Sequence, residues 1–145
     1  MLNIASADTH ELSENDRQTI ETLYRAFNSG DPELLNDALA DDWHDTPMAP
    51  GQQPGLAGMK PMVTAFLAAF ADLSITPQEV VGSRGRAAVR LTLSGRHVGD
   101  WMGVPATNKR FEIDMHEMHH IEDGRITHTW HLEDWAGWRQ QIGAA

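Results

Sequence analysis

The chain contains no cysteine among its 145 residues, which excludes disulfide bonds and thiolate metal sites and fits a reducing compartment. Positive charge is also scarce, because 11 lysine and arginine residues stand against 21 aspartate and glutamate residues, for a formal net charge of -10. So acidic a chain argues against nucleic acid or an anionic membrane as a partner, whereas a neutral or hydrophobic small molecule stays compatible.

Long hydrophobic runs are missing too. No apolar stretch approaches the roughly 20 residues that cross a bilayer. A signal peptide would begin with basic residues followed by an apolar run, whereas the N-terminal residues here are polar and acidic. These absences predict a cytoplasmic protein without a membrane partner.

The length predicts one domain with its own hydrophobic core. We interpret residues 1–12 as a flexible N-terminal tail and residues 13–145 as the single domain. Capping residues and apolar side chains at helical spacing predict three helices, over about residues 13–29, 31–39 and 57–70.

From about residue 73 onward, the hydrophobic period changes from 3.6 to 2, which is typical of strands. Two helices, a strand, a helix and then an antiparallel meander predict an α+β fold, a strongly curved, mostly antiparallel sheet wrapped by three helices into a cone with a mouth. Apolar side chains such as Phe66 and Met115 would line this cone, a common form of small-molecule site. Strands are expected over residues 41–46, 75–81, 87–97, 111–121 and 126–135.

Residues 111–134 stand out because they hold five of the eight histidines on two strands joined by an Asp-Gly turn. The count suggests a metal site, but His116 and His120 fall on one face of their strand and His119 on the other. His128 and His131 also have opposite parity. At most two or three of these rings could converge, without a usual ligand spacing, so we expect no metal.

Several short motifs carry a resemblance to a known family. They are Ala26-Phe27-Asn28-Ser29-Gly30, Arg96-His97-Val98-Gly99, Asp123-Gly124-Arg125-Ile126 and Arg139-Gln140-Gln141-Ile142-Gly143. With them, nearly the whole chain from about Asn15 resembles the SnoaL-like polyketide cyclases of the nuclear transport factor 2-like superfamily. The resemblance implies a cone-shaped α+β barrel and, commonly, a homodimer or larger oligomer formed through the outer face of the sheet.

The resemblance also implies a chemistry and two site positions. In the namesake cyclases, an aspartate on the last strand is the acid/base for a cofactor-free intramolecular aldol ring closure, and a histidine on the preceding strand helps to position the substrate. Alignment on the Asp123-Gly124 turn places the aspartate position at His131 and the histidine position at Glu117. The two residue types are therefore exchanged in this chain, which leaves a His–Glu pair able to move protons.

His131 is the first candidate for the general base, because imidazole titrates near neutral pH. The alternative is a histidine exposed to solvent or at a subunit interface, since amphipathicity alone buries the opposite face of Ile126, Trp130 and Leu132. Glu117 shares the apolar face of its own strand, where a carboxylate must lie in a pocket or be paired unless the strand end reaches solvent.

Five further residues are candidates for substrate binding. Of His44 and Asp45, on the short strand before the Pro/Gly-rich loop, one is expected to point inward, with structural packing as the equal alternative. Trp101 would cap a ligand or cover the edge of the sheet. The candidate binding set is His44, Asp45, Phe66, Trp101 and Met115.

These observations predict a cofactor-independent enzyme that transfers protons next to a carbonyl of a hydrophobic or aromatic small molecule, as an aldol cyclase or an isomerase does. A hydrolase or hydroxylase in the same pocket, or a non-catalytic binding module, is the alternative. We expect a homodimer or tetramer.

Overall fold

The computed structural model describes residues 11–144 as one α+β unit. Most of the predicted tail, residues 1–12, lies outside the described residues. Leu12, at its end, is buried in the hydrophobic core.

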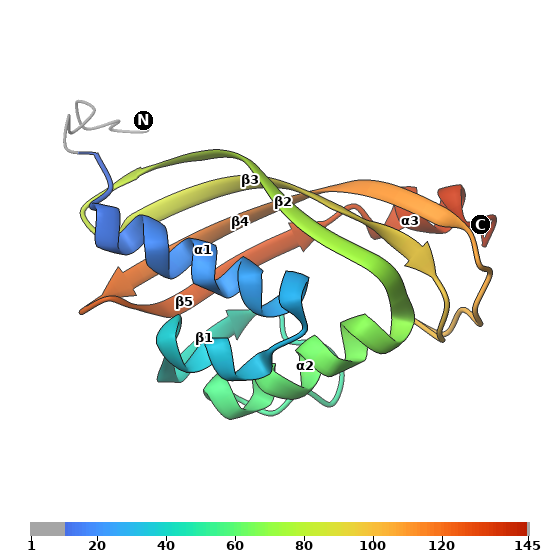
Figure 1. Cartoon of the computed structure of the whole chain (residues 1–145), viewed down its shortest axis with the longest axis horizontal. Coiled ribbons are helices and arrows are strands. Elements are labelled where there is room, and N and C mark those ends of the chain that lie inside the picture. The colour runs from blue at the N-terminus through green and yellow to red at the C-terminus, as the bar shows by residue number, and fades with distance from the viewer. Residues whose placement is uncertain (1–10, 145) are drawn as a thin grey trace, which may run out of the picture.

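Five strands form one curved sheet in the order β1-β5-β4-β3-β2 (Figure 1). β1 runs parallel to β5, and the remaining neighbours are antiparallel, so the prediction of a mostly antiparallel sheet is confirmed. The sheet is not closed, and its edges are β1 and β2. In chain order, the elements are α1 (Glu14–Ser29), the 3-10 helix η1 (Pro32–Asp37), β1 (Leu39–Thr46), α2 (Gly55–Ala69), β2 (Phe70–Ser83), β3 (Arg86–His97), β4 (Arg110–Glu122), β5 (Arg125–Glu133) and α3 (Trp135–Gln141).

Local signals place the first helix as expected. The hydroxyl of Ser13 accepts a hydrogen bond from the Asp16 backbone N–H, and Gly30 ends α1 in the left-handed conformation with φ 71°. The second predicted helix is a short 3-10 helix instead, because the carbonyl of Ala38 already accepts the backbone N–H of Ile126 and the chain enters the sheet there.

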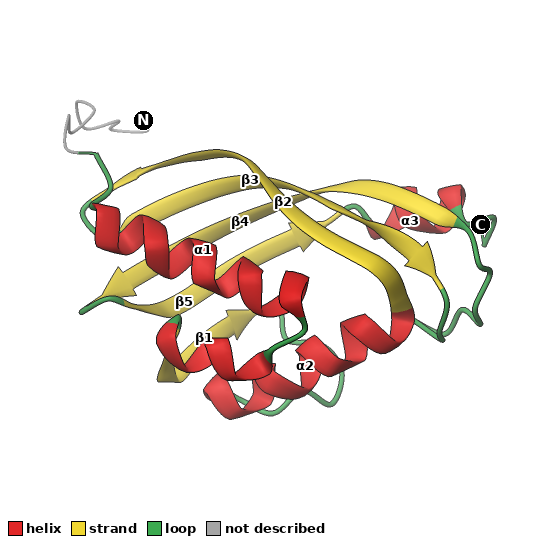
Figure 2. Ribbon diagram, in the orientation of Figure 1, coloured by secondary structure: helices red, strands yellow, loops and turns green. Residues whose placement is uncertain are grey.

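α1 and α2 lie on the same side of the sheet, and α3 lies at the end of β5 (Figure 2). Buried and exposed side chains alternate strictly along a strand where the sheet is regular. In β4, the residues from Phe111 to Ile121 at every second position are buried, and the residues between them face the outside. The concave face under the two helices therefore carries both the core and the pocket.

A bulge in β5 decides which of its side chains face inward. His120 pairs with His128, but the adjacent Ile121 pairs with Ile126, which leaves Thr127 as the extra residue. Ile126 is buried before the bulge, and beyond it the alternation is shifted by one residue.

The amphipathic expectation for β5 is therefore wrong beyond Ile126. Trp130 and Leu132 are 39% and 75% exposed on the outer face, while Thr129 and His131 turn inward.

Candidate active site

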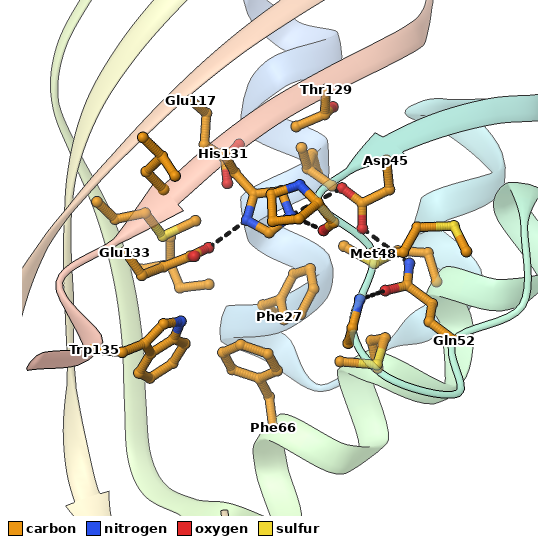
Figure 3. A pocket seen from close by; sticks show the side chains of 18 of the residues that line it. Phe27, Asp45, Met48, Gln52, Phe66, Glu117, Thr129, His131, Glu133 and Trp135 are labelled. Carbon is orange, nitrogen blue, oxygen red and sulfur yellow. Dashed lines mark hydrogen bonds and ion pairs between the residues drawn. The ribbon is translucent and has the colours of Figure 1, made fainter. Parts of the chain in front are cut away.

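A pocket of about 320 Å³ opens between the concave face of the sheet and the helices α1 and α2. Its wall is mainly apolar, and most of its few polar groups lie on β1, β4 and β5 (Figure 3). Such a volume and lining are typical of sites for small organic molecules. The apolar lining includes Phe27, Phe66, Trp101, Trp135, Met48, Met59, Met62, Met102 and Met115.

His131 lies at the centre of the polar wall, with both ring nitrogens engaged (Figure 3). Nδ1 is 2.7 Å from Oε1 of Glu133, and Nε2 is 2.8 Å from the carbonyl oxygen of Pro47. Nε2 also lies 3.1 Å from Oδ1 of Asp45. Because carbonyl and carboxylate oxygens only accept hydrogen bonds, this environment suits a ring that carries a proton on each nitrogen.

The electrostatics of His131 agree with that geometry. Burial lowers the pKa of the ring, but the neighbouring carboxylates of Asp45 and Glu133 outweigh burial and raise the pKa from 6.5 to about 11. At neutral pH, His131 is therefore a cation held between two carboxylates.

Asp45 is fixed by a short chain of hydrogen bonds from the loop after β1. Its Oδ2 accepts the side-chain N–H of Gln52 at 2.9 Å, and Oε1 of Gln52 accepts the backbone N–H of Ala49 at 2.9 Å. The backbone contact determines which end of the Gln52 amide faces Asp45. The loop that follows β1 therefore orients a carboxylate that lines the pocket.

Glu117 belongs to a second group of polar residues deeper in the fold, here called the inner network. Oε2 of Glu117 accepts the hydroxyl of Tyr24 at 3.1 Å and lies 3.0 Å from Nε2 of His119. Nδ1 of His119 is 2.9 Å from the Thr129 hydroxyl, which also accepts the indole N–H of Trp43 at 3.0 Å. Burial, followed by the charge of Glu117, raises the pKa of Tyr24, so its hydroxyl keeps its proton.

The structure brings the two predicted catalytic residues into one pocket. Glu117 and His131 are direct partners across the β4–β5 ladder, and both line the cavity. Their hydrogen bonds run to different partners, Glu117 to the inner network and His131 to Asp45, Glu133 and Pro47. Their catalytic roles stay predictions.

Of the five predicted binding residues, Asp45, Phe66, Trp101 and Met115 line the pocket. The expectation for His44 is wrong, because Trp43 and Asp45 take the inward positions of β1. His44 points to the outer face, where its ring stacks on His128 with centroids 4.6 Å apart. These placements bring the residues to the cavity and leave substrate contact as a prediction.

Sequence reasoning missed Tyr24, Gln52, His119 and Glu133 as parts of the site. Glu133 could have been found from its parity, because it lies two residues beyond His131 on the same face. The helical spacing of Tyr24 indicates only a buried side chain on its helix, and the histidine pattern that includes His119 suggests only a metal site. Gln52 lies in a loop whose path no local pattern predicts.

Two findings concern residues 11–144 as a whole. No group of three or more histidine, aspartate or glutamate side chains in this range is arranged to hold a metal ion. No helix within the same range is long and apolar enough to span a membrane.

Comparison with known proteins agrees with this architecture. The profile of the family described as SnoaL-like polyketide cyclase matches residues 17–142. Aklanonic acid methyl ester cyclase AcmA of Streptomyces galilaeus is 29% identical over 130 residues, covering 86% of this chain and 88% of AcmA. Nogalonic acid methyl ester cyclase of Streptomyces nogalater is 27% identical over 123 residues, covering 83% of this chain and 92% of that cyclase.

The solved structures give the same result. TsrD from Streptomyces laurentii superposes with a TM-score of 0.86 at 32% identity, covering 93% of this chain and all of TsrD. IdmH from Streptomyces antibioticus superposes with a TM-score of 0.76 at 33% identity, covering 88% of this chain and 98% of IdmH. The profile match spans most of the chain, and the fold matches as well: the chain belongs to the SnoaL-like polyketide cyclase family.

Proposed function

We propose that this chain catalyses a cofactor-independent, aldol-type ring closure within an aromatic, polyketide-derived carbonyl compound. The observation that carries the proposal is the shared pocket of His131 and Glu117, in which a charged ring and a carboxylate face a mainly apolar cavity. The names of AcmA and the nogalonic acid methyl ester cyclase support a methyl ester of this compound class as substrate.

The pocket lining favours a flat aromatic substrate. Five of the seven methionines in the sequence line the cavity, together with the rings of Phe27 and Phe66. Unbranched thioether side chains adapt to irregular shapes and make favourable contacts with aromatic rings. Phe27 and Phe66 lie opposite the polar wall in Figure 3, so a planar ligand in the space between these rings and the polar wall would lie beside His131.

In the proposed reaction, a C–H bond next to a carbonyl is broken and its electron pair forms an enolate. The enolate carbon then attacks a second carbonyl of the same molecule, and the resulting alkoxide takes up a proton. The mass does not change. The His131 cation stabilises the negative charge that develops on oxygen, an effect that is strong inside a pocket that excludes water.

This proposal changes one role that the sequence suggested. His131 was the expected base, but two carboxylates keep its ring protonated, so we assign it the electrostatic role instead. Glu117 is held in a fixed orientation by Tyr24 and His119, which suits an acid or an orienting group for the substrate.

The test is incubation of the purified chain with aklanonic acid methyl ester and with nogalonic acid methyl ester, followed by chromatography with mass detection. Ring closure gives a product of unchanged mass, whereas hydrolysis adds water and hydroxylation adds oxygen. We expect H131A to lower turnover by roughly 10²–10³-fold, as for other removals of a group that stabilises an oxyanion. H128A, on the outer face of the same strand, is the matched control and should leave turnover unchanged.

Binding of both esters without any product would contradict the enzyme proposal and favour a binding module. Equal turnover in H131A and H128A would contradict the role given to His131.

A further inference from the structure

One carboxylate oxygen in the pocket is buried and has no hydrogen-bond partner. Four buried side-chain nitrogen or oxygen atoms within residues 11–144 lack a partner, and three of them belong to aromatic rings, those of His97, Trp101 and Trp138. The fourth is Oδ1 of Asp45, on a side chain that is 7% exposed. An unsatisfied buried carboxylate oxygen is costly, so a group retained in this state is a candidate for function.

The geometry around Asp45 explains why Oδ1 stays free. Gln52 holds Oδ2, so the orientation of the carboxylate is set from the loop side. Nε2 of His131 lies 3.1 Å from Oδ1, but its N–H is directed at the carbonyl of Pro47 at 2.8 Å. Oδ1 is therefore attracted by a nearby cation but makes no hydrogen bond.

The two other carboxylates of the pocket are placed differently. Oε1 of Glu133 accepts the Nδ1–H of His131 in a short bond of 2.7 Å. Oε2 of Glu117 is shared by Tyr24 and His119 in the inner network. Asp45 thus has a buried oxygen that makes no hydrogen bond and lies 3.1 Å from Nε2 of the His131 cation.

We propose that Asp45 is the general base of the reaction, with Oδ1 as the atom that takes the proton. This assignment rests on the proposed function and names a catalytic carboxylate on β1, in place of His131 on β5. Oδ1 removes a proton from the carbon next to the substrate carbonyl, and the electron pair of the broken C–H bond moves to the enolate oxygen near His131. After the new C–C bond forms, the protonated Asp45 returns its proton to the alkoxide, so no co-reactant is needed.

The arrangement separates two tasks that one histidine cannot perform at once. A ring that is kept protonated stabilises negative charge, but it has no lone pair with which to accept a proton. Asp45 supplies that lone pair and also helps to hold the ring in its charged form. Gln52 is then a positioning residue, because it acts on the substrate only through Asp45.

The experiment compares D45N with D42N, which makes the same chemical change at an exposed position of β1. Three quantities are measured with aklanonic acid methyl ester and nogalonic acid methyl ester: kcat, the Kd of the ester, and hydrogen–deuterium exchange in D₂O at the carbon next to the carbonyl. We expect D45N to lose roughly 10²–10⁴-fold in kcat and to lose the enzyme-dependent exchange, with Kd changed less than tenfold. D42N should match the unchanged chain in all three.

D45E provides a second variant in case D45N does not fold. It keeps a carboxylate beside His131 but displaces the oxygen by about one carbon–carbon bond, and a misplacement of that size costs a base on the order of 10²-fold in kcat. If Asp45 served only as the counter-ion of His131, D45E would keep kcat within about threefold, and the assignment would be wrong.

The remaining outcomes separate the two proposals. Unchanged kcat and exchange in D45N, or a loss of binding alone, would overturn the role of Asp45 and leave the proposed function intact. Absence of both turnover and exchange in the unchanged chain, on either ester, would overturn the proposed function and the Asp45 assignment together.

Discussion

At the scale of single residues, His131 illustrates how neighbours reverse the usual role of a side chain. Histidine is an expected acid/base because its ordinary pKa lies near neutrality. Here Asp45 and Glu133 face its two nitrogens, and the pKa rises to about 11. The sequence predicts that His131 is in the pocket, but its charge state depends on a carboxylate 86 positions earlier in the chain, on a strand that becomes its neighbour only in the fold.

The raised pKa predicts a pH-dependent stability. Below about pH 6.5, the folded and unfolded chains both hold the proton, and the ion pairs of His131 contribute fully to the free energy of unfolding. Between about pH 7 and 10, only the folded chain holds it, so this contribution is lost by up to about 1.4 kcal/mol per pH unit.

Urea unfolding of the unchanged chain and of H131Q at pH 7, 8, 9 and 10 measures this loss. The difference between their free energies of unfolding should shrink steadily as the pH rises. A difference that stays constant over the range would show that His131 does not hold an extra proton in the folded state.

At the scale of elements, the sequence predicts what short-range signals control. The helix cap at Ser13, the helix end at Gly30 and the Asp123-Gly124 turn each depend on a few neighbouring residues, and the structure confirms all three. The bulge at Thr127 has no such local signal, because it exists only in the register between β4 and β5. For the same reason, alternation alone placed Trp130 on the wrong face.

Whether His44 or Asp45 faces the pocket also depends on contacts between residues far apart in the sequence. Both lie on an isolated short strand, and its pattern leaves the inward residue undetermined. Pairing with β5 settles it, since His44 is the partner of His128 and stacks on that ring at the outer face. Gln52 and Tyr24 complete the site from a loop and a helix, and their contacts with Asp45 and Glu117 depend on tertiary packing.

Thr129 joins three elements through the inner network, and its loss should weaken the fold. T129V keeps the shape of the side chain but leaves the indole N–H of Trp43 and Nδ1 of His119 without their shared oxygen. Leaving buried polar groups unpaired costs roughly 1–3 kcal/mol, which urea unfolding can measure.

T127V is the matched control for this prediction. Thr127 is half-buried at the bulge, and its hydroxyl contacts the carbonyl of His120 at 3.4 Å and Nδ1 of the half-buried His128 at 3.2 Å, both outside the inner network. We expect a change within about 0.5 kcal/mol, the usual range for a position of this kind. Equal losses in T127V and T129V would mean that the inner network does not contribute specifically to stability.

At the scale of the whole molecule, the outer face of the sheet carries a row of exposed apolar side chains. Cross-strand pairing aligns Val81, Ala88, Met118 and Trp130 over β2, β3, β4 and β5. Three of these are large and well exposed, Val81 at 56%, Met118 at 46% and Trp130 at 39%. A continuous apolar row of this kind is typical of a protein–protein interface.

Beside the apolar row runs a row of histidines. His44, His128 and His120 are successive partners across β1, β5 and β4, and Trp130 packs against both His120 and His128. Burial lowers the pKa of His120, and the charges of Arg86 and His128 lower it further, against an opposing effect of Glu122. His120 is therefore expected to be largely uncharged at neutral pH, when it can be covered by another protein surface.

We expect a homodimer that buries this face, as the family resemblance implies, and expect it to weaken in acid. Protonation of His120 in acid would place a charge in the covered face, and a buried charge opposes association. Sedimentation velocity should show a dimer at pH 7.5 and a rise in its dissociation constant toward pH 5. M118D places a charge in the apolar row and should give a monomer at pH 7.5, whereas L67D, on α2 at 38% exposure, should remain dimeric. A dimer that is equally stable in M118D and L67D would place the interface on another surface.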